Sequence, residues 1–263
     1  MDWMEVIRTR KSVRTFDGRP LSLEDKEKLC SYIETITNPY GIPMKFVWLD
    51  PEKHGLSSPV IAGETVYIAA KVPKIEYCEE AFGYSFEKMV LYAWSIGIGT
   101  TWIGGTMKRE MFEKAAGTSD DEFMMIVSPL GYPAVKRSEV DSKLRNSVHG
   151  DDRFPANELF FDGDFSTPLA DEKEKELLES VRWAPSAANM QPCRVVVTDG
   201  NKYHFYENHT KGYKSSISKW DIQKIDVGIA LCHFMSVTDG KFDISDPGIA
   251  VGEDREYIAT VTV

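Results

Sequence analysis

Apolar positions recur at helical spacing in some stretches of the chain and cluster as short runs in others. Leu29, Ile33 and Ile36 form one apolar face of a segment that begins at Ser22, with Asp25 three positions later as an approximate capping box. By these criteria we predict helices over 3–9, 22–36, 79–96, 108–116 and 221–235, and a further helix that ends at Ala184. Short apolar runs predict strands over 44–49, 65–70, 123–127, 194–198, 203–206 and 257–263.

Two further stretches need their own interpretation. Residues 89–107 carry no charge and are long enough to raise the question of a membrane helix. Four glycines fall in the second half, so we expect a buried helix that ends in a glycine-rich turn, Gly97 to Gly105. Residues 138–165 are polar and without clear period, which predicts a long irregular loop or linker.

The pattern of the first part of the chain restarts in the second. Residues 20–29 align with residues 168–177 at an offset of 148 (168 − 20). Residues 43–48 align with residues 192–197 after one extra residue (192 − 43 = 149). We infer two copies of one helix–strand unit.

The two copies continue to correspond beyond this helix–strand unit, although their later elements match less exactly. The predicted helix over 221–235 is the counterpart of the one over 79–96. We therefore divide the chain into a first half, residues 1–150, and a second half, residues 151–263. Both halves mix helices with strands, which predicts an α+β fold.

The first copy carries a basic run, Arg8 to Arg14, that the second copy lacks. At the offset of 148, Arg10 and Arg14 fall on Glu158 and Asp162, so the charge is inverted. Arginine and lysine supply strong, charge-assisted hydrogen bonds to anions. An ordinary solvated run of charge is the alternative interpretation of this segment.

The second copy carries a turn of small residues, 185–189, that the first copy lacks at 36–40. Pro185 restricts Ala184 away from helical geometry, so the helix before it should end there. Each copy thus keeps one half of a site. A fused pair can keep one composite site and lose the other, whereas a homodimer needs both halves in every copy.

Charge and cysteine content argue against some classes of binding surface and of cysteine site. The formal net charge is −10 and the pI is about 5.1, which argues against a nucleic-acid or anionic-membrane surface. An anionic ligand must therefore meet a local basic cluster. The cysteines at 30, 78, 193 and 232 have no metal-type or redox-type spacing. With no evident signal peptide, we expect reduced thiols and a cytoplasmic protein.

Competing motifs are weak. The run Gly97 to Trp102 lacks the third glycine of a dinucleotide fingerprint and follows a helix, and no Gly-Lys-Ser/Thr makes it a P-loop. The histidines at 54, 149, 204, 209 and 233 show no ligand spacing, so we expect no metal site.

Four motifs together resemble the FMN-dependent nitroreductase family. They are Arg10 to Arg14, which is similar to an Arg-Arg-Ser-x-Arg run, Gly97 to Ile103, Leu130 to Pro133, and Pro185 to Pro192, which reads Pro-Ser-x-x-Asn-x-Gln-Pro. The family places the last of these motifs between the first two. The order found here resembles a fused, two-copy subgroup of nitroreductase type.

The resemblance implies a nitroreductase-like fold in which the two halves form a pseudo-dimer, with FMN at the interface. It implies these cofactor contacts: Arg10, Lys11, Ser12, Arg14, Trp102, Ile103, Gly104, Gly105, Lys136, Arg137, Pro185, Ser186, Ala187 and Asn189. The basic residues would surround the phosphate and the pyrimidine edge, and Lys11 or Arg14 would tune the flavin. No side-chain nucleophile is required.

The implied activity is hydride transfer from NADH or NADPH through FMN to a small-molecule electron acceptor. We expect one FMN per chain, and a monomer is compatible with the fused copies. The alternative is a nitroreductase-like protein that has lost flavin and acts as a binding or structural module.

Overall fold

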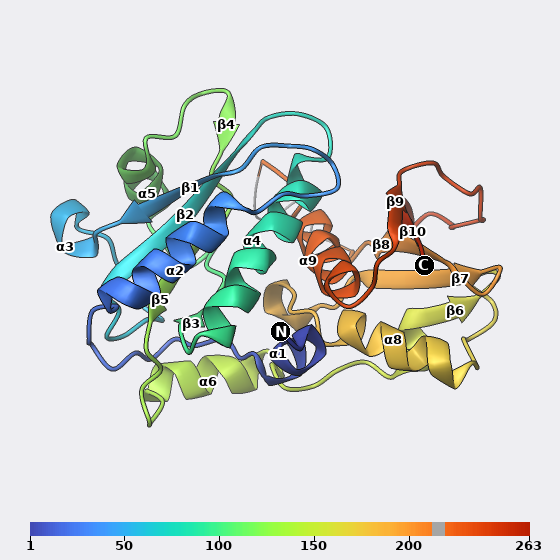
Figure 1. Cartoon of the computed structure of the whole chain (residues 1–263), viewed down its shortest axis with the longest axis horizontal. Coiled ribbons are helices and arrows are strands. Elements are labelled where there is room, and N and C mark those ends of the chain that lie inside the picture. The colour runs from blue at the N-terminus through green and yellow to red at the C-terminus, as the bar shows by residue number, and fades with distance from the viewer. Residues whose placement is uncertain (212–218) are drawn as a thin grey trace. The chain divides into compact units, whose positions relative to one another are not determined.

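The computed structural model describes residues 1–211 and 219–263 (Figure 1). These residues form two compact units. Unit 1 consists of Met1–Arg8, Glu79–Tyr84 and Asp151–Val263. Unit 2 consists of Thr9–Cys78 and Ser85–Gly150. The division into functional halves at residue 150 stays a prediction.

Unit 2 contains a five-stranded sheet. Its strands are β1 (Lys45–Leu49), β2 (Val66–Pro73), β3 (Gly99–Thr100), β4 (Glu122–Phe123) and β5 (Val127–Gly131). The order is β1-β2-β5-β3, with β4 paired to β2, and all neighbours are antiparallel. All five residues of β5 are buried, so the centre of the sheet lies in the core of this unit.

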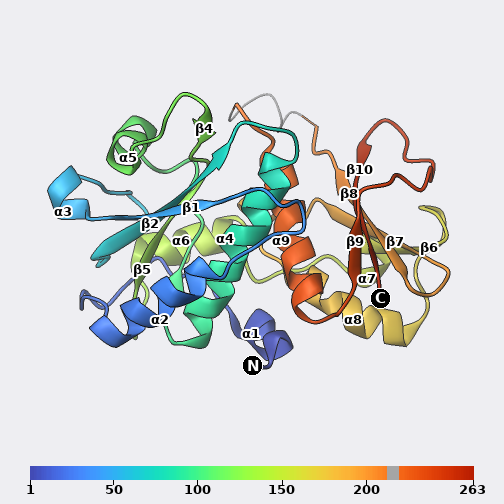
Figure 2. The ribbon, with the colours of Figure 1, turned by 45° about the horizontal axis from the view of Figure 1, so that its top comes forward.

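Helices accompany this sheet. They are α2 (Leu23–Glu34), α3 (Pro51–His54), α5 (Arg109–Ala116), α6 (Glu139–Ser147) and the later part of α4 (Cys78–Ser95). In both ribbon views α2 and α4 lie side by side (Figures 1 and 2). The rings of Tyr32 and Tyr92 stack between them, with centroids 3.9 Å apart.

Unit 1 contains a second five-stranded sheet. Its strands are β6 (Phe160–Asp162), β7 (Cys193–Thr198), β8 (Lys202–Asn208), β9 (Lys241–Asp243) and β10 (Arg255–Thr262). The order is β6-β7-β8-β10-β9. Only the β6–β7 pair is parallel among the pairs of this sheet in the described residues.

The helices of unit 1 are α1 (Trp3–Thr9), the start of α4, α7 (Ala156–Leu159), α8 (Glu172–Arg182) and α9 (Ile222–Ser236). α8 packs against α9, where Nδ1 of the buried His233 donates to the carbonyl of Ser180 at 3.0 Å. α9 is apolar almost all round, as expected for a helix that is buried along its length.

The same order of elements occurs twice. The first series runs α2-β1-β2-α4-β5, and the second runs α8-β7-β8-α9-β10, each with its three strands antiparallel in chain order. The mixed α+β fold with two similar halves is therefore confirmed. The copies differ between their first two strands, where α3 and a long loop correspond to a tight turn, and before their last strands, where β3, α5 and β4 correspond to β9.

The predicted helices and most strands are confirmed, with small shifts at their ends. Ser22 caps α2, because its Oγ accepts from the backbone N–H of Asp25 at 3.1 Å. Among the described residues, no helix is both long and apolar enough to cross a membrane.

The predicted strand over 123–127 is wrong. The structure ends the short β4 at Phe123 and begins β5 only at Val127, so residues 124–126 belong to neither strand. The guanidinium of Arg109 donates to the carbonyls of Met124 and Met125 at 2.7 and 3.1 Å. These buried carbonyl groups therefore find their partners in a side chain and not in a strand.

The predicted irregular stretch over 138–165 is also wrong, because it contains α6, α7 and β6. α6 begins at Ser138, whose Oγ accepts from the backbone N–H of Asp141 at 3.1 Å. Only Asp141 of α6 is buried. Polar contacts fix this helix, so the apolar pattern could not reveal it.

Candidate functional site

The basic run continues from α1 as an extended segment of unit 2. Val13 N–H donates to the carbonyl of Thr100 on β3 at 2.8 Å. Phe16 N–H donates to Ala62 at 2.8 Å, and Ala62 N–H donates back to the carbonyl of Arg14 at 2.9 Å. The alternate side chains of this segment are thus fixed in direction by a backbone ladder.

Glycines of two other motifs make room for this segment. A Cβ on Gly99 would lie 2.8 Å from Cβ of Val13, and a Cβ on Gly131 would lie 2.8 Å from Cδ1 of Phe16. Both distances are shorter than real side-chain contacts, so only glycine allows the approach. The basic run, the glycine-rich turn and the Leu130–Pro133 motif therefore meet in unit 2.

Arg10 is the buried member of the basic run. Its side chain is 4% exposed, and its Nε lies 3.6 Å from Oε1 of Glu87 on α4. The other carboxylate oxygen of Glu87 accepts from Nε1 of Trp102 at 3.0 Å. Burial lowers the pKa of Arg10, Glu87 opposes that shift, and Arg145 adds to it.

The guanidinium of Arg10 has hydrogen-bond donors that lack an acceptor among the described residues. Its Nε and Nη1 are buried and make no hydrogen bond to any residue that the structure describes. A buried donor without a partner costs about 1–3 kcal/mol. An anionic group with several acceptor oxygens, such as a phosphate, would satisfy these donors. The residues at this point therefore fit the anionic end of the predicted cofactor.

Arg14 is held from α6. Its Nη1 lies 3.4 Å from Oδ1 of Asp141, and Thr15 Oγ1 donates to the other oxygen at 3.2 Å. Burial lowers the pKa of Arg14, Asp141 opposes that shift, and Arg145 and Arg137 add to it. Arg14 therefore has positive neighbours as well as its carboxylate partner.

Positive charge exceeds negative charge around the run. The electrostatic neighbours of Arg10 and Arg14 comprise two further guanidinium groups, Arg137 and Arg145, and two carboxylates, Glu87 and Asp141. Four cations against two anions leave an excess that favours an anionic ligand. Lys11, Lys136 and Arg137 are exposed, and Ser12 is half-buried.

The sequence analysis missed Glu87, Asp141 and Arg145. The last two lie on α6, inside the stretch predicted to be irregular. The spacing of Ser138 and Asp141 is that of a capping box, which was the signal available for this helix. No local signal distinguished Glu87, because its partner Arg10 is 77 positions away (87 − 10).

The segment from Trp102 to Gly105 is used largely for packing. Ile103 is buried in the core and exchanges backbone hydrogen bonds with Val127 at 2.9 and 3.0 Å. The half-buried Trp102 contacts Phe86, and the carbonyl of Gly104 accepts from Arg109 at 2.9 Å. Gly105 is exposed. Cofactor contacts from this segment stay a prediction.

The turn of small residues lies in unit 1, after the end of α8. It forms a short 3-10 helix, Ala187–Asn189, in which Ala188 and Asn189 have φ of 48° and 58°. Gln191 follows with φ of 49°. Left-handed geometry costs about 1–3 kcal/mol for each residue other than glycine, and such strain gathers at functional sites.

Several hydrogen bonds keep the turn in this geometry. Ser186 Oγ accepts from Gln191 N–H at 2.8 Å, and Asn189 Nδ2 donates to the carbonyl of Asp152 at 3.1 Å. Gln191 Oε1 accepts from Phe154 N–H at 2.8 Å. The Ser186 and Asn189 side chains, predicted as ligand donors, thus have partners inside the unit. Pro185 and Ala187 are half-buried.

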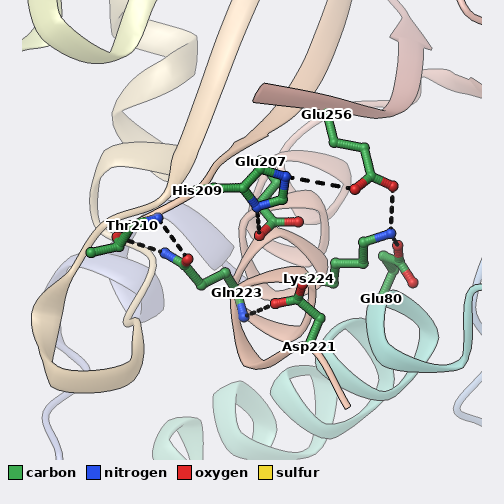
Figure 3. A network of polar contacts seen from close by, with 8 residues as sticks. All are labelled: Glu80, Glu207, His209, Thr210, Asp221, Gln223, Lys224 and Glu256. Atoms are coloured by element: carbon green, nitrogen blue, oxygen red, sulfur yellow. Dashed lines mark hydrogen bonds and ion pairs between the residues drawn. The ribbon is translucent and has the colours of Figure 1, made fainter. Parts of the chain in front are cut away.

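A polar network lies elsewhere in unit 1 (Figure 3). Nζ of Lys224 lies 2.6 Å from Glu256 and 4.0 Å from Glu80, and Nδ1 of His209 lies 2.6 Å from Glu207. Burial raises the pKa of Glu80 to about 7, against the opposing charge of Lys224.

Three members of this network could in principle hold a metal ion. Ligand atoms of Glu207, His209 and Asp221 all lie within 4.8 Å of one another. Glu207 interacts with the charge of Lys224, and Glu207 also shares a hydrogen bond with His209. We interpret the group as an ion-pair network, and the absence of a metal site stays a prediction.

Comparison with solved structures identifies the fold. A "putative nitroreductase" from Thermotoga maritima is 20% identical, with 100% of this chain and 94% of that chain covered and a TM-score of 0.57. A nitroreductase family protein from Clostridium novyi is 20% identical, with 54% and 91% covered and a TM-score of 0.45. An FMN-dependent nitroreductase from Clostridium difficile is 12% identical, with 51% and 90% covered and a TM-score of 0.45.

Among curated proteins, none matches this chain. The family described as "Putative TM nitroreductase" matches residues 2–237, which is most of the sequence. This match confirms the resemblance carried by the four motifs. The chain therefore belongs to this nitroreductase family.

Proposed function

We propose that the protein is an FMN-dependent oxidoreductase that takes hydride from NADH or NADPH and reduces a small acceptor. Membership of a nitroreductase family supports an oxidoreductase. The observation that carries the cofactor assignment is Arg10, whose buried guanidinium has unused donors among the described residues. Together with Arg14, Arg137 and Arg145, its positive charge suits an anionic cofactor.

In this proposal the first half of the chain, residues 1–150, binds the anionic end of FMN. Arg10 and Arg14 bind the phosphate, with Ser12 as a hydroxyl donor. The exposed Lys136 and Arg137 add positive charge from the surface. Charge-assisted hydrogen bonds of this kind are about twice as strong as neutral ones.

The second half, residues 151–263, contributes the turn. Pro185, Ser186, Ala187 and Asn189 contact the ring through backbone groups and small side chains, which permit close approach of a flat ligand. When bound, FMN supplies the redox chemistry, and the chain binds, orients and tunes it. Lys11 and Arg14 are the candidates for the positive charge beside the pyrimidine edge.

One composite site per chain follows from the unequal halves. The second copy has acidic residues where the first has its basic run, and the first copy lacks the turn. A single chain therefore supplies the parts of one site. The cytoplasmic, monomeric state stays a prediction.

The second candidate is a protein of the same fold that has lost flavin and acts as a binding or structural module. Ser186 and Asn189 favour this candidate, because both side chains already bond within unit 1. The unused donors of Arg10 favour the cofactor.

Flavin binding separates the two candidates. Protein purified from its own host should carry visible flavin absorbance. Binding to the protein should quench the fluorescence of added FMN, and added FMN should raise the melting temperature of the protein. Arg10→Gln should weaken FMN binding by about 100-fold, equivalent to about 3 kcal/mol, because it removes a buried charged donor. Arg8→Gln, at the exposed first position of the run, is the matched control. A colourless protein that ignores added FMN would contradict the oxidoreductase.

A further inference from the structure

The two long helices cross through a reciprocal pair of glycines. A Cβ on Gly83 of α4 would overlap the carbonyl oxygen of Ile225 on α9. A Cβ on Gly228 of α9 would overlap the carbonyl oxygen of Glu80 on α4. Each glycine thus meets the residue three positions before the other glycine. This is the pattern of a two-fold, self-complementary contact.

This contact sets the correspondence between the helices. The offset is 145 for the glycines (228 − 83) and the same for their partners (225 − 80). It differs from the 148 of the preceding helix pair because the connecting segments differ in length. Residues of α4 and α9 can therefore be compared position by position.

The comparison shows that each helix has a buried carboxylate at a position where the other has a small residue without charge. Glu87 falls on Cys232 (87 + 145), and Asp226 falls on Ala81 (226 − 145). All four residues are buried. Glu87 is paired with Arg10, so α4 supports the basic run.

Asp226 makes the matching contact on the other helix. The backbone N–H of Ala187 donates to its two carboxylate oxygens at 3.0 and 3.1 Å. Ala187 directly precedes the left-handed residues Ala188 and Asn189. The carboxylate of Asp226 thus fixes the turn where its unusual geometry begins.

We propose that Asp226 is a positioning residue of the cofactor site, which holds the turn in the geometry that contacts the flavin ring. This role rests on the proposed function. Glu87 is its counterpart for the phosphate end, so each long helix has a buried acid that contacts its own half of the proposed site.

The burial of Asp226 supports a specific role. Burial raises the pKa of Asp226, the bond from Ala187 opposes that shift, and the charges of Glu207 and Asp221 add to it. An apolar residue, such as the alanine at the matching position of α4, avoids this desolvation. The acid is therefore unfavourable to α9 alone and useful through the bond that it makes.

The test compares FMN with riboflavin, which has the same ring and no phosphate. Asp226→Ala should weaken binding of both ligands by about tenfold, the value of one charged hydrogen bond. Asp226→Asn should restore most of this loss, because its amide oxygen can still accept from Ala187. Arg10→Gln should weaken FMN while leaving riboflavin within about twofold, since its partner is the phosphate.

A double-mutant cycle tests whether Asp226 acts through Ala187. Ala187→Pro deletes the donor, and the extended Ser186 before it, with φ −141° and ψ 160°, accepts a following proline. In that background, Asp226→Ala should change affinity by less than about twofold. Glu256→Gln, which removes a carboxylate of the polar network, is the control with unchanged affinity.

The outcomes separate the two proposals. Wild-type protein that binds neither ligand ends the proposed function and the positioning role with it. Wild-type binding with an unchanged affinity in folded Asp226→Ala overturns the positioning role alone. If the effects of Asp226→Ala and Ala187→Pro on affinity are fully additive in the double-mutant cycle, the positioning role is also overturned. If Asp226→Ala does not fold, the decision rests on Ala187→Pro, which deletes the donor of the bond: an unchanged affinity of folded Ala187→Pro for both ligands overturns the role.

Discussion

The basic run and the small-residue turn are held in opposite ways. The run is a regular, extended segment that backbone hydrogen bonds and closely approaching glycines fix in place. The turn is left-handed at Ala188, Asn189 and Gln191, and the side chains of Asn189 and Gln191 tether it to the backbone of residues 152–154. The run thus offers charge on a rigid frame, whereas the turn offers a backbone shape that its surroundings must maintain.

This difference predicts where each region is vulnerable. Damage to the run should come from added volume or from loss of a charge partner. Damage to the turn should come from loss of a tether, and some changes there should even stabilise the protein. The two regions also depend on different acids, Glu87 and Asp141 for the run and Asp226 for the turn.

The largest effect is expected from Gly99→Val. The new side chain would collide with Val13, whose Cβ already lies 2.8 Å from the ideal Cβ position. We expect a loss of about 3 kcal/mol in the free energy of unfolding, measured by urea denaturation. Gly105→Val is the control, because a Cβ there meets no atom within 4 Å. Equal stability of the two variants would contradict the close approach.

A smaller loss is expected from Asp141→Ala. This change leaves Arg14, 15% exposed, without its carboxylate and also removes the acceptor of Thr15. The free energy of unfolding should fall by about 2 kcal/mol, below the full value for a buried pair because Arg14 is partly solvated. Glu139→Ala, at an exposed position of the same helix, should change it by less than about 0.5 kcal/mol. Similar losses in both variants would remove the special role of Asp141.

The smallest effect is a gain. Ala188→Gly should stabilise the protein by about 1 kcal/mol, because glycine adopts the φ of 48° without steric cost. Ala170→Gly, at an exposed position outside the helices and strands, should be neutral or slightly destabilising. The melting temperatures of the two variants provide the measurement. A destabilised Ala188→Gly would show that the left-handed geometry is not strained.

Much of the fold followed from the sequence because the repeat doubled the information. The cap and apolar face of α2 and the uncharged run of α4 predicted one copy, and the restart predicted the other. α6 was missed because its contacts are polar. The segment at Met124 and Met125 was misassigned because Arg109 supplies the hydrogen bonds that a strand would otherwise make.

The motifs of the proposed site could be identified from the sequence, whereas the residues that support them could not. Arg10 and the turn at Pro185 were visible as sequence patterns. Glu87 and Asp226 lie on helices that were predicted correctly, yet their partners are distant in sequence. A single acidic residue in an apolar helix does not indicate which residue it contacts. The strain at Ala188 was also hidden, because alanine ordinarily avoids a positive φ.

The central claim is that one chain keeps a single composite flavin site from two unequal halves. Titration of the purified protein with FMN, followed by flavin fluorescence and absorbance, measures the number of sites directly. The account predicts one FMN per chain. A stoichiometry near two per chain, or no binding at all, would contradict it.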